Sequence, residues 1–500
     1  MSATTRPLGH DTGATATQGD SSGRHPVGSA GDASSAPTPP VTPTEAVRRA
    51  RAVFASGVTR PFDWRLARLA ELRRLLTEQE DVLCAALHDD LRKSRTEAMV
   101  TEVGFLVREV DHTRRHLAGW LRPRRVPVPL TLGGGRASVV PEPLGVVTVI
   151  APWNYPVQLC LSPVLGALAA GNTVVLKPSE LAPATSRALA TLLPRYVGEG
   201  AVQVVEGGVA ETTELLSRRV DHVFYTGNGT VGRVVLEAAA RHLTPVTLEL
   251  GGKSPAYVDP SADLAVTAKR LVWGKFTNAG QTCIAPDYVL ATPAVLDRLT
   301  PLLSRAVEDF FGDDPRRSDD FGRIVSDRHV QRLAGLLEGQ RCVTGGGVDA
   351  AERYVAPTVL ADVDPASAVM AEEIFGPVLP LVAVPDLDAA IAFVVERDKP
   401  LALYVFADDP LVERRFERET SSGALAVNMP LAHVAVPDLP FGGVGASGTG
   451  SYHGRASVEL FSHHKPVLRQ RTRPDTAALL YPPSRSLRAR LASRLMGLGR

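Results

Sequence analysis

The feature that most constrains the fold is a regular alternation of short apolar runs with helical stretches through the middle of the chain. The apolar run Val146 to Ile150 is followed by a helical stretch from Leu159 to Ala170, and the same order then repeats. Near-continuous apolar strands separated by helices are typical of a parallel sheet covered on both faces. The sequence therefore predicts a doubly wound α/β domain. Its expected strands are 146–150, 173–176, 202–205 and 222–225.

The sequence predicts further helices before this region and a second α/β domain after it. Between Thr44 and Leu76, apolar residues recur every three to four positions among arginines, and another helical run spans roughly Ser94 to Leu121. These patterns predict long amphipathic helices. After Val246 a second alternation of strands and helices continues to about Val427, which predicts a second α/β domain.

Three segments differ from this pattern. Residues 1–40 are rich in Ser, Thr, Gly, Ala and Pro and contain too few large apolar side chains to offset the entropy of ordering, so we expect a disordered extension. Prolines and glycines between Val126 and Pro143 predict an extended excursion or hairpin. After Val467 the chain mixes Arg with Ala and Leu, which favours a solvated or surface-lying helix, with membrane contact as the alternative.

Composition excludes several classes of protein. With 55 Lys and Arg against 54 Asp and Glu, the net charge of +1 provides no field that would attract nucleic acid or an anionic membrane. The 4 cysteines are widely spaced and form no C-x-x-C pair, so we expect reduced thiols in the cytoplasm and no metal site. No apolar stretch predicts a membrane span or a signal peptide.

A glycine motif follows one predicted strand. Residues Gly227 to Gly232 spell G-x-G-x-x-G between the run ending at Tyr225 and a helical stretch, where backbone amides at a helix N-terminus can face a phosphate. Taken alone, the motif is equally compatible with a glycine-rich turn.

Lys177 and Glu180 directly follow the predicted strand at 173–176. The carboxyl ends of parallel strands are where open α/β sheets bind ligands, and a lysine and a carboxylate at that place can hold ribose hydroxyls. From these residues alone, a solvated charged loop is the stronger reading.

Cys283 is the cysteine whose surroundings suit a nucleophile. It lies in the run Asn278-Ala-Gly-Gln-Thr-Cys-Ile-Ala, which is small and polar, whereas Cys84 and Cys160 stand among apolar residues of helical patterns. A cysteine nucleophile needs a base, and the oxyanion it creates needs hydrogen-bond donors. Glu249 and Asn154 are the candidates, although a strand-end carboxylate and a turn asparagine are also ordinary structural residues.

Several motifs occur together and in order. They are Pro152-Trp-Asn-Tyr-Pro156, Lys177-Pro-Ser-Glu180, Tyr225-Thr-Gly, Leu248-Glu-Leu-Gly-Gly-Lys253, Gly280-Gln-Thr-Cys283, Glu372-Glu-Ile-Phe-Gly-Pro377 and Pro440-Phe-Gly-Gly-Val-Gly445. This set resembles the aldehyde dehydrogenase superfamily over roughly Thr44 to Pro466. The sequence from Gly274 to Tyr288 is similar to that of the class 3 branch, which includes fatty, aromatic and coniferyl aldehyde dehydrogenases.

The resemblance implies an aldehyde dehydrogenase fold, with a Rossmann-like NAD-binding domain, an α/β catalytic domain and a small β oligomerisation arm. The expected division is a disordered extension at 1–43, the NAD-binding domain at 44–248 with the arm at 126–143, the catalytic domain at 249–430, a return segment with an oligomerisation strand at 431–466, and a basic tail at 467–500. A homodimer is the expected assembly, with dimer against tetramer left open.

The resemblance also implies the role of each residue. Cys283 would attack the aldehyde, the Asn154 amide and the Cys283 backbone N–H would hold the oxyanion, and Glu249 would activate the water that hydrolyses the thioester. The residues expected to contact the cofactor are Trp153, Lys177, Glu180, Thr226, Gly227, Gly232, Glu373 and Phe375.

We therefore expect NAD(P)-dependent oxidation of a medium- or long-chain aliphatic aldehyde, or of an aromatic aldehyde, to the carboxylic acid. NAD is expected first, because the Glu180 carboxylate would repel a 2′-phosphate, with NADP as a second option. Where the family commonly has Gly-Ser-Thr, this chain has Gly227-Asn228-Gly229-Thr230, which leaves the cofactor geometry at that turn open. The alternatives are a non-catalytic protein of the same fold and a coenzyme-A-acylating enzyme, whose members lack the glutamate that Glu249 matches.

Overall fold

A computed structural model describes residues 41–129, 135–198, 200–475 and 481–482. The chain divides into two units, residues 1–39 and 40–500, and the described residues all belong to the second. The expected N-terminal extension lies outside the described residues up to position 40. Helix α1 (Pro43–Ala55) begins directly afterwards, with Thr42 as its N-cap accepting a hydrogen bond from the Glu45 backbone N–H.

The first sheet has six strands in the order β17-β7-β6-β3-β4-β5, and all neighbouring pairs are parallel except β17 with β7. The predicted alternation of strands and helices is confirmed. The strands are β3 (Val146–Ile150), β4 (Thr173–Lys177), β5 (Val202–Val204), β6 (His222–Gly227), β7 (Val246–Leu250) and β17 (Gly448–Thr449), and the helices between them are α6 (Gln158–Ala170), α7 (Pro183–Tyr196), α8 (Val209–Leu216) and α9 (Gly229–Ala240).

The second sheet has seven strands in the order β10-β13-β14-β9-β8-β15-β16, parallel except for β10 against β13. It confirms the second predicted alternation. Its strands are β8 (Pro255–Val258), β9 (Tyr288–Ala291), β10 (Arg341–Thr344), β13 (Thr358–Ala361), β14 (Val378–Ala383), β15 (Ala402–Phe406) and β16 (Ala424–Val427), and its helices are α10 (Leu264–Phe276), α11 (Pro293–Phe311), α12 (Asp327–Leu337), α13 (Ala368–Ala371), α14 (Leu387–Val395) and α15 (Pro410–Glu419).

The helical run predicted from Ser94 to Leu121 is not one continuous α-helix. A π-helical turn, η1 (Met99–Val103), separates α4 (Arg95–Ala98) from α5 (Gly104–Trp120). A Cβ atom on Gly104 would lie 2.6 Å from the Met99 carbonyl oxygen, so a glycine suits this turn. Such turns often occur at functional sites, and this one turns Glu102 inward. The two preceding helices are α2 (Phe62–Glu78) and α3 (Glu80–Leu91).

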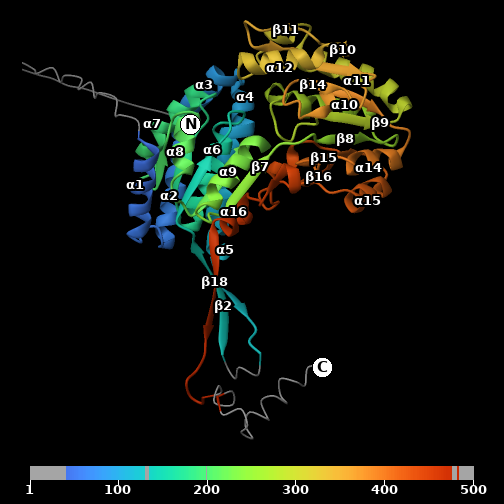
Figure 1. Cartoon of the computed structure of the whole chain (residues 1–500). Helices are drawn as coiled ribbons and strands as arrows, with labels where there is room; N and C mark the ends of the chain where they lie inside the picture. Colours follow the sequence, from blue (N-terminus) through green and yellow to red (C-terminus); the bar gives the residue numbers. More distant parts are fainter. Residues whose placement is uncertain (1–40, 130–134, 199, 476–480, 483–500) are drawn as a thin grey trace, which may run out of the picture. The chain divides into compact units, whose positions relative to one another are not determined.

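The excursion predicted between Val126 and Pro143 forms part of a three-stranded antiparallel sheet. Its strands are β1 (Arg124–Val126), β2 (Arg136–Pro143) and β18 (Ser462–Arg469), with β2 in the middle. Figure 1 shows β2 and β18 side by side. Strand β18 follows helix α16 (Gly454–Leu460) and continues to Arg469, so the first residues of the predicted tail belong to this sheet, while residues 483–500 lie outside the described residues.

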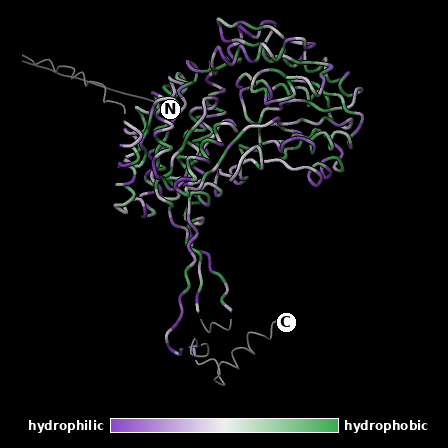
Figure 2. The backbone as a smooth tube through the Cα atoms, viewed as in Figure 1, coloured by the Kyte–Doolittle hydropathy of each residue, from purple (hydrophilic) through white to green (hydrophobic). Residues whose placement is uncertain are grey.

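The cores of both sheets follow the hydropathy pattern. Strands β3, β4, β9 and β15 are buried at every position, while the surface helices alternate hydrophobic and hydrophilic residues (Figure 2). Full burial of the strands agrees with parallel sheets covered on both faces. Over the described residues, no helix is both long enough and apolar enough to cross a bilayer.

Glu97 in α4 provides a test of stability. Its side chain is partly buried and its Oε1 has no hydrogen-bond partner among the described residues, and burial raises the pKa of the carboxyl to about 7. The folded state therefore holds a proton that the unfolded chain releases near pH 4.5, so stability falls as pH rises between these values. Replacing Glu97 by Gln should stabilise the fold at pH 8 by about 1–2 kcal/mol.

Thermal unfolding of wild type and Glu97→Gln at pH 4.5 and pH 8 checks this prediction. The expected result is a small difference in Tm at the lower pH and a higher Tm for the variant at the higher pH. Equal Tm values at pH 8 would contradict the assignment of a buried, protonated carboxyl.

Candidate active site

A tightly built turn carries Cys283. Between α10 and β9, Asn278 and Ala279 have positive φ angles of 54° and 51°, and Gly280 follows with φ 74°. A Cβ atom on Gly280 would lie 2.2 Å from the Gly376 carbonyl oxygen, so only glycine fits there. Backbone strain of this kind persists where the surrounding structure fixes it, and it often marks functional sites.

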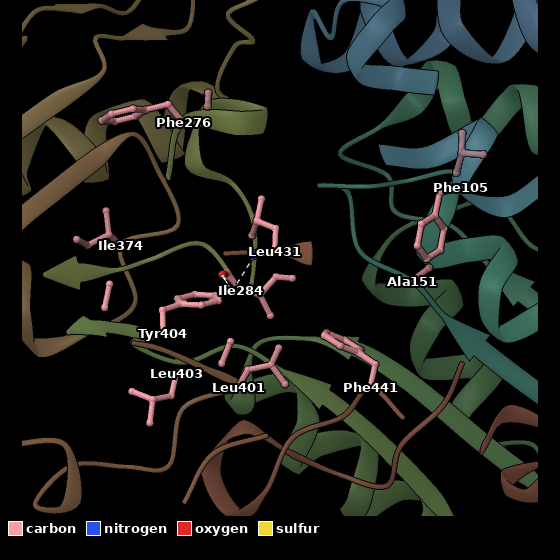
Figure 3. Packing of buried hydrophobic residues seen from close by; sticks show 14 of the residues in the cluster. Phe105, Ala151, Phe276, Ile284, Ile374, Leu401, Leu403, Tyr404, Leu431 and Phe441 are labelled. Atoms are coloured by element: carbon pink, nitrogen blue, oxygen red, sulfur yellow. Dashed lines mark hydrogen bonds between the residues drawn. The ribbon is translucent and has the colours of Figure 1, made fainter. Parts of the chain in front are cut away.

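Cys283 lines an apolar cavity of about 140 Å³. The wall combines residues from helix α5, the Cys283 turn and the segment after β16. Figure 3 shows Phe105, Ile284, Leu431 and Phe441 from this wall, and the Tyr404 hydroxyl donates a hydrogen bond of 2.5 Å to the Ile284 carbonyl oxygen. An apolar cavity with one thiol in its wall suits a ligand that has a hydrophobic body and one reactive polar group.

Asn154 is directed at the Cys283 turn. It lies on the loop after β3, its side chain is buried, and its Nδ2 donates a hydrogen bond of 3.0 Å to the Gln281 carbonyl oxygen. The next residue repeats the contact, because the Tyr155 hydroxyl lies 2.6 Å from Thr282 Oγ1. The two loops predicted from separate motifs are therefore joined by hydrogen bonds in the structure.

Glu249 lies in the buried part of β7, one residue before the end of the strand. Its exposed fraction is 3%, and neither carboxyl oxygen has a hydrogen-bond partner among the described residues. Burial raises the pKa of this carboxyl well above its ordinary value. Strand β17 fixes its place, since Gly448 pairs with Glu249 across the sheet. A buried carboxyl without partners is costly to stability and is a strong candidate for an acid or base in catalysis.

The pKa of the Cys283 thiol depends on burial and on the carboxyl and amide groups around it. Burial raises the pKa of the Cys283 thiol, and the Glu373 and Glu249 carboxylates raise it further. The backbone amides of Cys283 and Ile284 act in the opposite direction because they stabilise the thiolate. The thiol is therefore protonated at neutral pH in this structure, and formation of the nucleophile requires a base or an added positive charge nearby.

A second loop, after α13, carries Glu373 and Phe375. A Cβ atom on Gly251 would lie 1.9 Å from Glu373 Oε2, so the glycine lets this carboxylate approach the backbone after β7. Burial and the Asp287 charge raise the pKa of Glu373 to about 8. The Phe375 ring meets Trp153 edge to face, with ring centroids 5.3 Å apart. The residues predicted to contact the nicotinamide end of a cofactor thus lie beside the Cys283 site.

The ion pair of Lys253 and Asp287 holds this second loop. Lys253 Nζ donates to Asp287 Oδ2 at 2.6 Å and to the Glu372 carbonyl oxygen at 2.8 Å, and Asp287 accepts the Ile374 backbone N–H at 3.2 Å. These bonds lie on both sides of Glu373 in the chain. The position of Glu373 is therefore set by buried polar contacts as well as by Gly251.

The remaining predicted cofactor residues lie at the carboxyl ends of β4 and β6. Lys177 ends β4 and its Nζ pairs with Glu180 at 2.9 Å. Thr226 is the last residue but one of β6, and its buried hydroxyl has no hydrogen-bond partner among the described residues. A Cβ atom on Gly227 would lie 2.2 Å from the Tyr225 hydroxyl oxygen, so a glycine is required. A partnerless hydroxyl beside a glycine turn fits the phosphates and ribose of a dinucleotide.

The departure from Gly-Ser-Thr has a structural role. Asn228 is the N-cap of α9, and its side chain accepts the Val231 backbone N–H at 3.0 Å. Gly232 lies one turn further on, where a Cβ atom would stand 3.2 Å from a Leu250 side-chain carbon, so this glycine serves packing of the helix on β7.

Sequence reasoning missed the residues that support the site from behind. Lys93 and Glu102 form a buried ion pair next to the Asn154 loop, and the Gln281 side chain spans from Asn278 to Val325. No motif marks the ion pair, because isolated charged residues in a helical region look like an ordinary solvated surface. Among the described residues, no cluster of His, Cys, Asp and Glu has an arrangement that would hold a metal ion.

Comparison with known proteins shows which protein family the chain belongs to. Residues 39–467 match the model of the aldehyde dehydrogenase family. The chain is 48% identical over 442 residues to the dimeric NADP-preferring aldehyde dehydrogenase of Canis lupus familiaris, an alignment that covers 88% of this chain and 98% of the relative. It is also 48% identical over 448 residues to aldehyde dehydrogenase family 3 member B1 of Homo sapiens, covering 89% of this chain and 96% of the relative.

Solved structures give the same result. A substrate-bound aldehyde dehydrogenase of Staphylococcus aureus superposes with a TM-score of 0.87 at 41% identity, covering 90% of this chain and 99% of that one. An aldehyde dehydrogenase of Mycobacterium tuberculosis in complex with NAD+ superposes with a TM-score of 0.78 at 30% identity, covering 85% and 89%.

The fold and the sequence together define an aldehyde-oxidising enzyme that depends on a nicotinamide dinucleotide. The chain belongs to the aldehyde dehydrogenase family, and its relatives place it in the class 3 branch. This confirms the resemblance seen in the sequence motifs.

Proposed function

We propose that this protein oxidises aromatic and medium- to long-chain aliphatic aldehydes to carboxylic acids with Cys283 as the nucleophile, and that NAD is the preferred cofactor. One observation carries the assignment of the site: Cys283 stands in the wall of an apolar cavity, within the electrostatic reach of a buried carboxyl, Glu249, that has no hydrogen-bond partner among the described residues. Catalytic groups with strongly perturbed pKa values typically lie in such cavities.

The chain's own residues account for each step. The Cys283 thiol releases its proton to water, the thiolate Sγ attacks the carbonyl carbon, and the oxygen that gains charge is held by Asn154 Nδ2 and the Cys283 backbone N–H. A bound oxidised dinucleotide would supply the acceptor for the hydride that leaves this carbon. The product is a thioester on Cys283. Glu249 then takes a proton from water, the hydroxide attacks the thioester, and the acid leaves as the thiol is restored.

The volume of the cavity determines how much of the substrate it can enclose. Its volume of about 140 Å³ is close to the ~150 Å³ of an engineered apolar cavity that binds benzene. A phenyl ring or a six-carbon chain therefore fills it, and a longer chain has to extend beyond it. We expect kcat/KM to rise from propanal to hexanal and then to change little for decanal. A continued rise through decanal would place further substrate contacts outside this cavity.

The Asn154 amide gives a direct test of the oxyanion assignment. Replacing Asn154 by Ala removes one donor and should lower kcat by roughly 10²- to 10³-fold, since the donor acts where charge develops. The dissociation constant for NAD should stay unchanged. The measurement is the rate of NADH formation with hexanal at saturating cofactor, and a fall of less than 3-fold would remove Asn154 from the mechanism.

The cofactor preference rests on Glu180. Its carboxylate pairs with Lys177 at the end of β4, where the resemblance places the adenine ribose, and a negative charge there disfavours a 2′-phosphate. The relative from Canis lupus familiaris is named as NADP-preferring, so the comparison of kcat/KM with NAD and NADP is informative. We expect kcat/KM to be higher with NAD than with NADP, and we expect Glu180→Gln to reduce the ratio of these two values. A wild-type preference for NADP would contradict it.

The proposal extends to assembly and location. We propose a homodimer in which the sheet β1-β2-β18 contributes to the contact, and the word dimeric in the relatives' names supports it. The molar mass measured by light scattering tests this assembly.

We also propose that the enzyme is cytoplasmic, because Cys84, Cys160, Cys283 and Cys342 are all free thiols. Cell fractionation would check this location. The domain boundaries after residues 43, 248, 430 and 466 are likewise proposed, and limited proteolysis tests them.

A further inference from the structure

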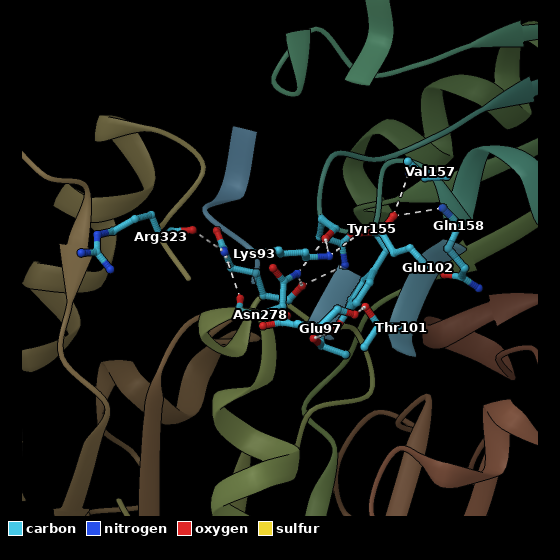
Figure 4. Close-up of polar contacts among 12 residues, drawn as sticks. Lys93, Glu97, Thr101, Glu102, Tyr155, Val157, Gln158, Asn278 and Arg323 are labelled. Carbon is cyan, nitrogen blue, oxygen red and sulfur yellow. Dashed lines mark hydrogen bonds and ion pairs between the residues drawn. The ribbon is translucent and has the colours of Figure 1, made fainter. Parts of the chain in front are cut away.

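The loop that carries Asn154 is held by a buried ion pair. Lys93, two residues beyond the end of α3, and Glu102, in the π-helical turn η1, are both fully buried, and Lys93 Nζ lies 2.5 Å from Glu102 Oε1 (Figure 4). Burying two charges is expensive unless further hydrogen bonds satisfy them. The remaining bonds of this pair therefore show what it holds in place.

Those bonds all reach the Asn154 loop. Lys93 Nζ donates to the Asn154 carbonyl oxygen at 3.0 Å and lies 3.8 Å from the centre of the Tyr155 ring. Glu102 Oε2 accepts the backbone N–H groups of Val157 and Gln158 at 2.8 and 3.0 Å. The lysine thus holds the middle of the loop, and the glutamate holds the beginning of α6, where the loop ends.

The Cys283 turn shares the same acceptor. Asn278 Nδ2 donates to the Asn154 carbonyl oxygen at 2.7 Å and to the Gln281 carbonyl oxygen at 3.1 Å. The Asn154 side chain donates to that same Gln281 oxygen. The Asn154 backbone is therefore fixed relative to the Cys283 turn by one network, and the ion pair is its anchor on the other side.

We propose that Lys93 and Glu102 are positioning residues that set the Asn154 amide relative to Cys283, so that the oxyanion receives both of its hydrogen bonds. This inference rests on the proposed function. Neither residue lines the cavity that holds Cys283. They should affect the acylation step, because the Asn154 amide acts in that step. A displacement of about 1 Å in such a group can lower the rate about 10²-fold.

The test is the rate of the first turnover, measured as the burst of NADH with hexanal at saturating NAD. Glu102→Gln should slow this burst by about 10-fold or more while leaving the affinity for NAD unchanged. The matched control is Asp90→Asn. Asp90 is a buried carboxylate that accepts the Ala184 and Thr185 backbone N–H groups at the start of α7, as Glu102 does at α6, and it does not contact the Asn154 loop. Its burst rate should remain that of wild type.

A double-mutant cycle separates positioning from general loss of structure. If Glu102 acts through the Asn154 side chain, Asn154→Ala combined with Glu102→Gln should be no slower than Asn154→Ala alone. Losses that multiply in the double variant would overturn the proposal, and so would an unchanged burst in Glu102→Gln. Failure of the wild type to form NADH from hexanal, or an unchanged burst in Asn154→Ala, would instead count against the proposed function.

A second variant covers failure of folding. Glu102→Gln leaves Lys93 as a lone buried charge, whereas Lys93→Met combined with Glu102→Gln leaves none, so this pair should fold. Its Tm and NAD affinity should match wild type, while its burst is slowed by about 10-fold or more. A wild-type burst rate in this folded variant would overturn the proposal.

Discussion

Replacing Cys283 by Ala is expected to lower kcat for aldehyde oxidation by roughly 10⁴-fold or more, because no other group can form the thioester. The variant should still bind NAD, since the residues proposed to hold the dinucleotide lie on β4, β6 and the Glu373 loop. The measurement is NADH formation from hexanal and benzaldehyde, with cofactor binding followed by the quenching of tryptophan fluorescence.

The matched control is Cys342→Ala. Cys342 is an exposed, free thiol on β10 and lies outside the cavity. Its replacement should leave kcat within 2-fold of wild type. Equal loss in both variants would point to a general effect of removing a thiol, and full activity of Cys283→Ala would exclude Cys283 as the nucleophile.

Replacing Glu249 by Gln should separate the two halves of the reaction. Without a base, hydrolysis of the thioester should slow by roughly 10²- to 10⁴-fold, while the first turnover still produces one equivalent of NADH. A burst followed by a very slow steady state is the expected record. Loss of the burst itself would mean that Glu249 is needed before the thioester forms.

The pH dependence follows from the same carboxyl. Burial raises the pKa of Glu249, so the group is protonated below that pKa and becomes a base only above it. The steady-state rate of wild type should therefore rise as pH increases through this pKa, and the residual rate of Glu249→Gln should lack that rise. A wild-type rate that falls between pH 7 and pH 9 would contradict the assignment.

Much of the fold was predictable because its determinants are local. Parallel strands buried on both faces require continuous apolar runs, and those at Val146 and Thr173 are easily seen. The loop at Cys283 was also predictable, since the run from Asn278 to Ala285 is small and polar and does not resemble an apolar helical face. The π-helical turn at Met99 was not predictable, because a single wider turn barely changes the spacing of apolar residues between Ser94 and Leu121.

The support of the site was not predictable for a different reason. Lys93 pairs with Glu102 and then with the backbone of Asn154, and a sequence pattern does not show that two charged residues are buried together. The place of Glu249 likewise depends on Gly448, a residue far along the chain that pairs with it. Such contacts follow from the packing of distant segments, whereas motifs report only on neighbours.

The most direct test of the central claim is to isolate the acyl-enzyme. Glu249→Gln is mixed with NAD and hexanal, quenched in acid, digested and analysed by mass spectrometry. We expect a hexanoyl group on the peptide that contains Cys283, formed only when NAD and hexanal are both present. A hexanoyl group on another residue, or none at all while NADH is still produced, would exclude a thioester on Cys283.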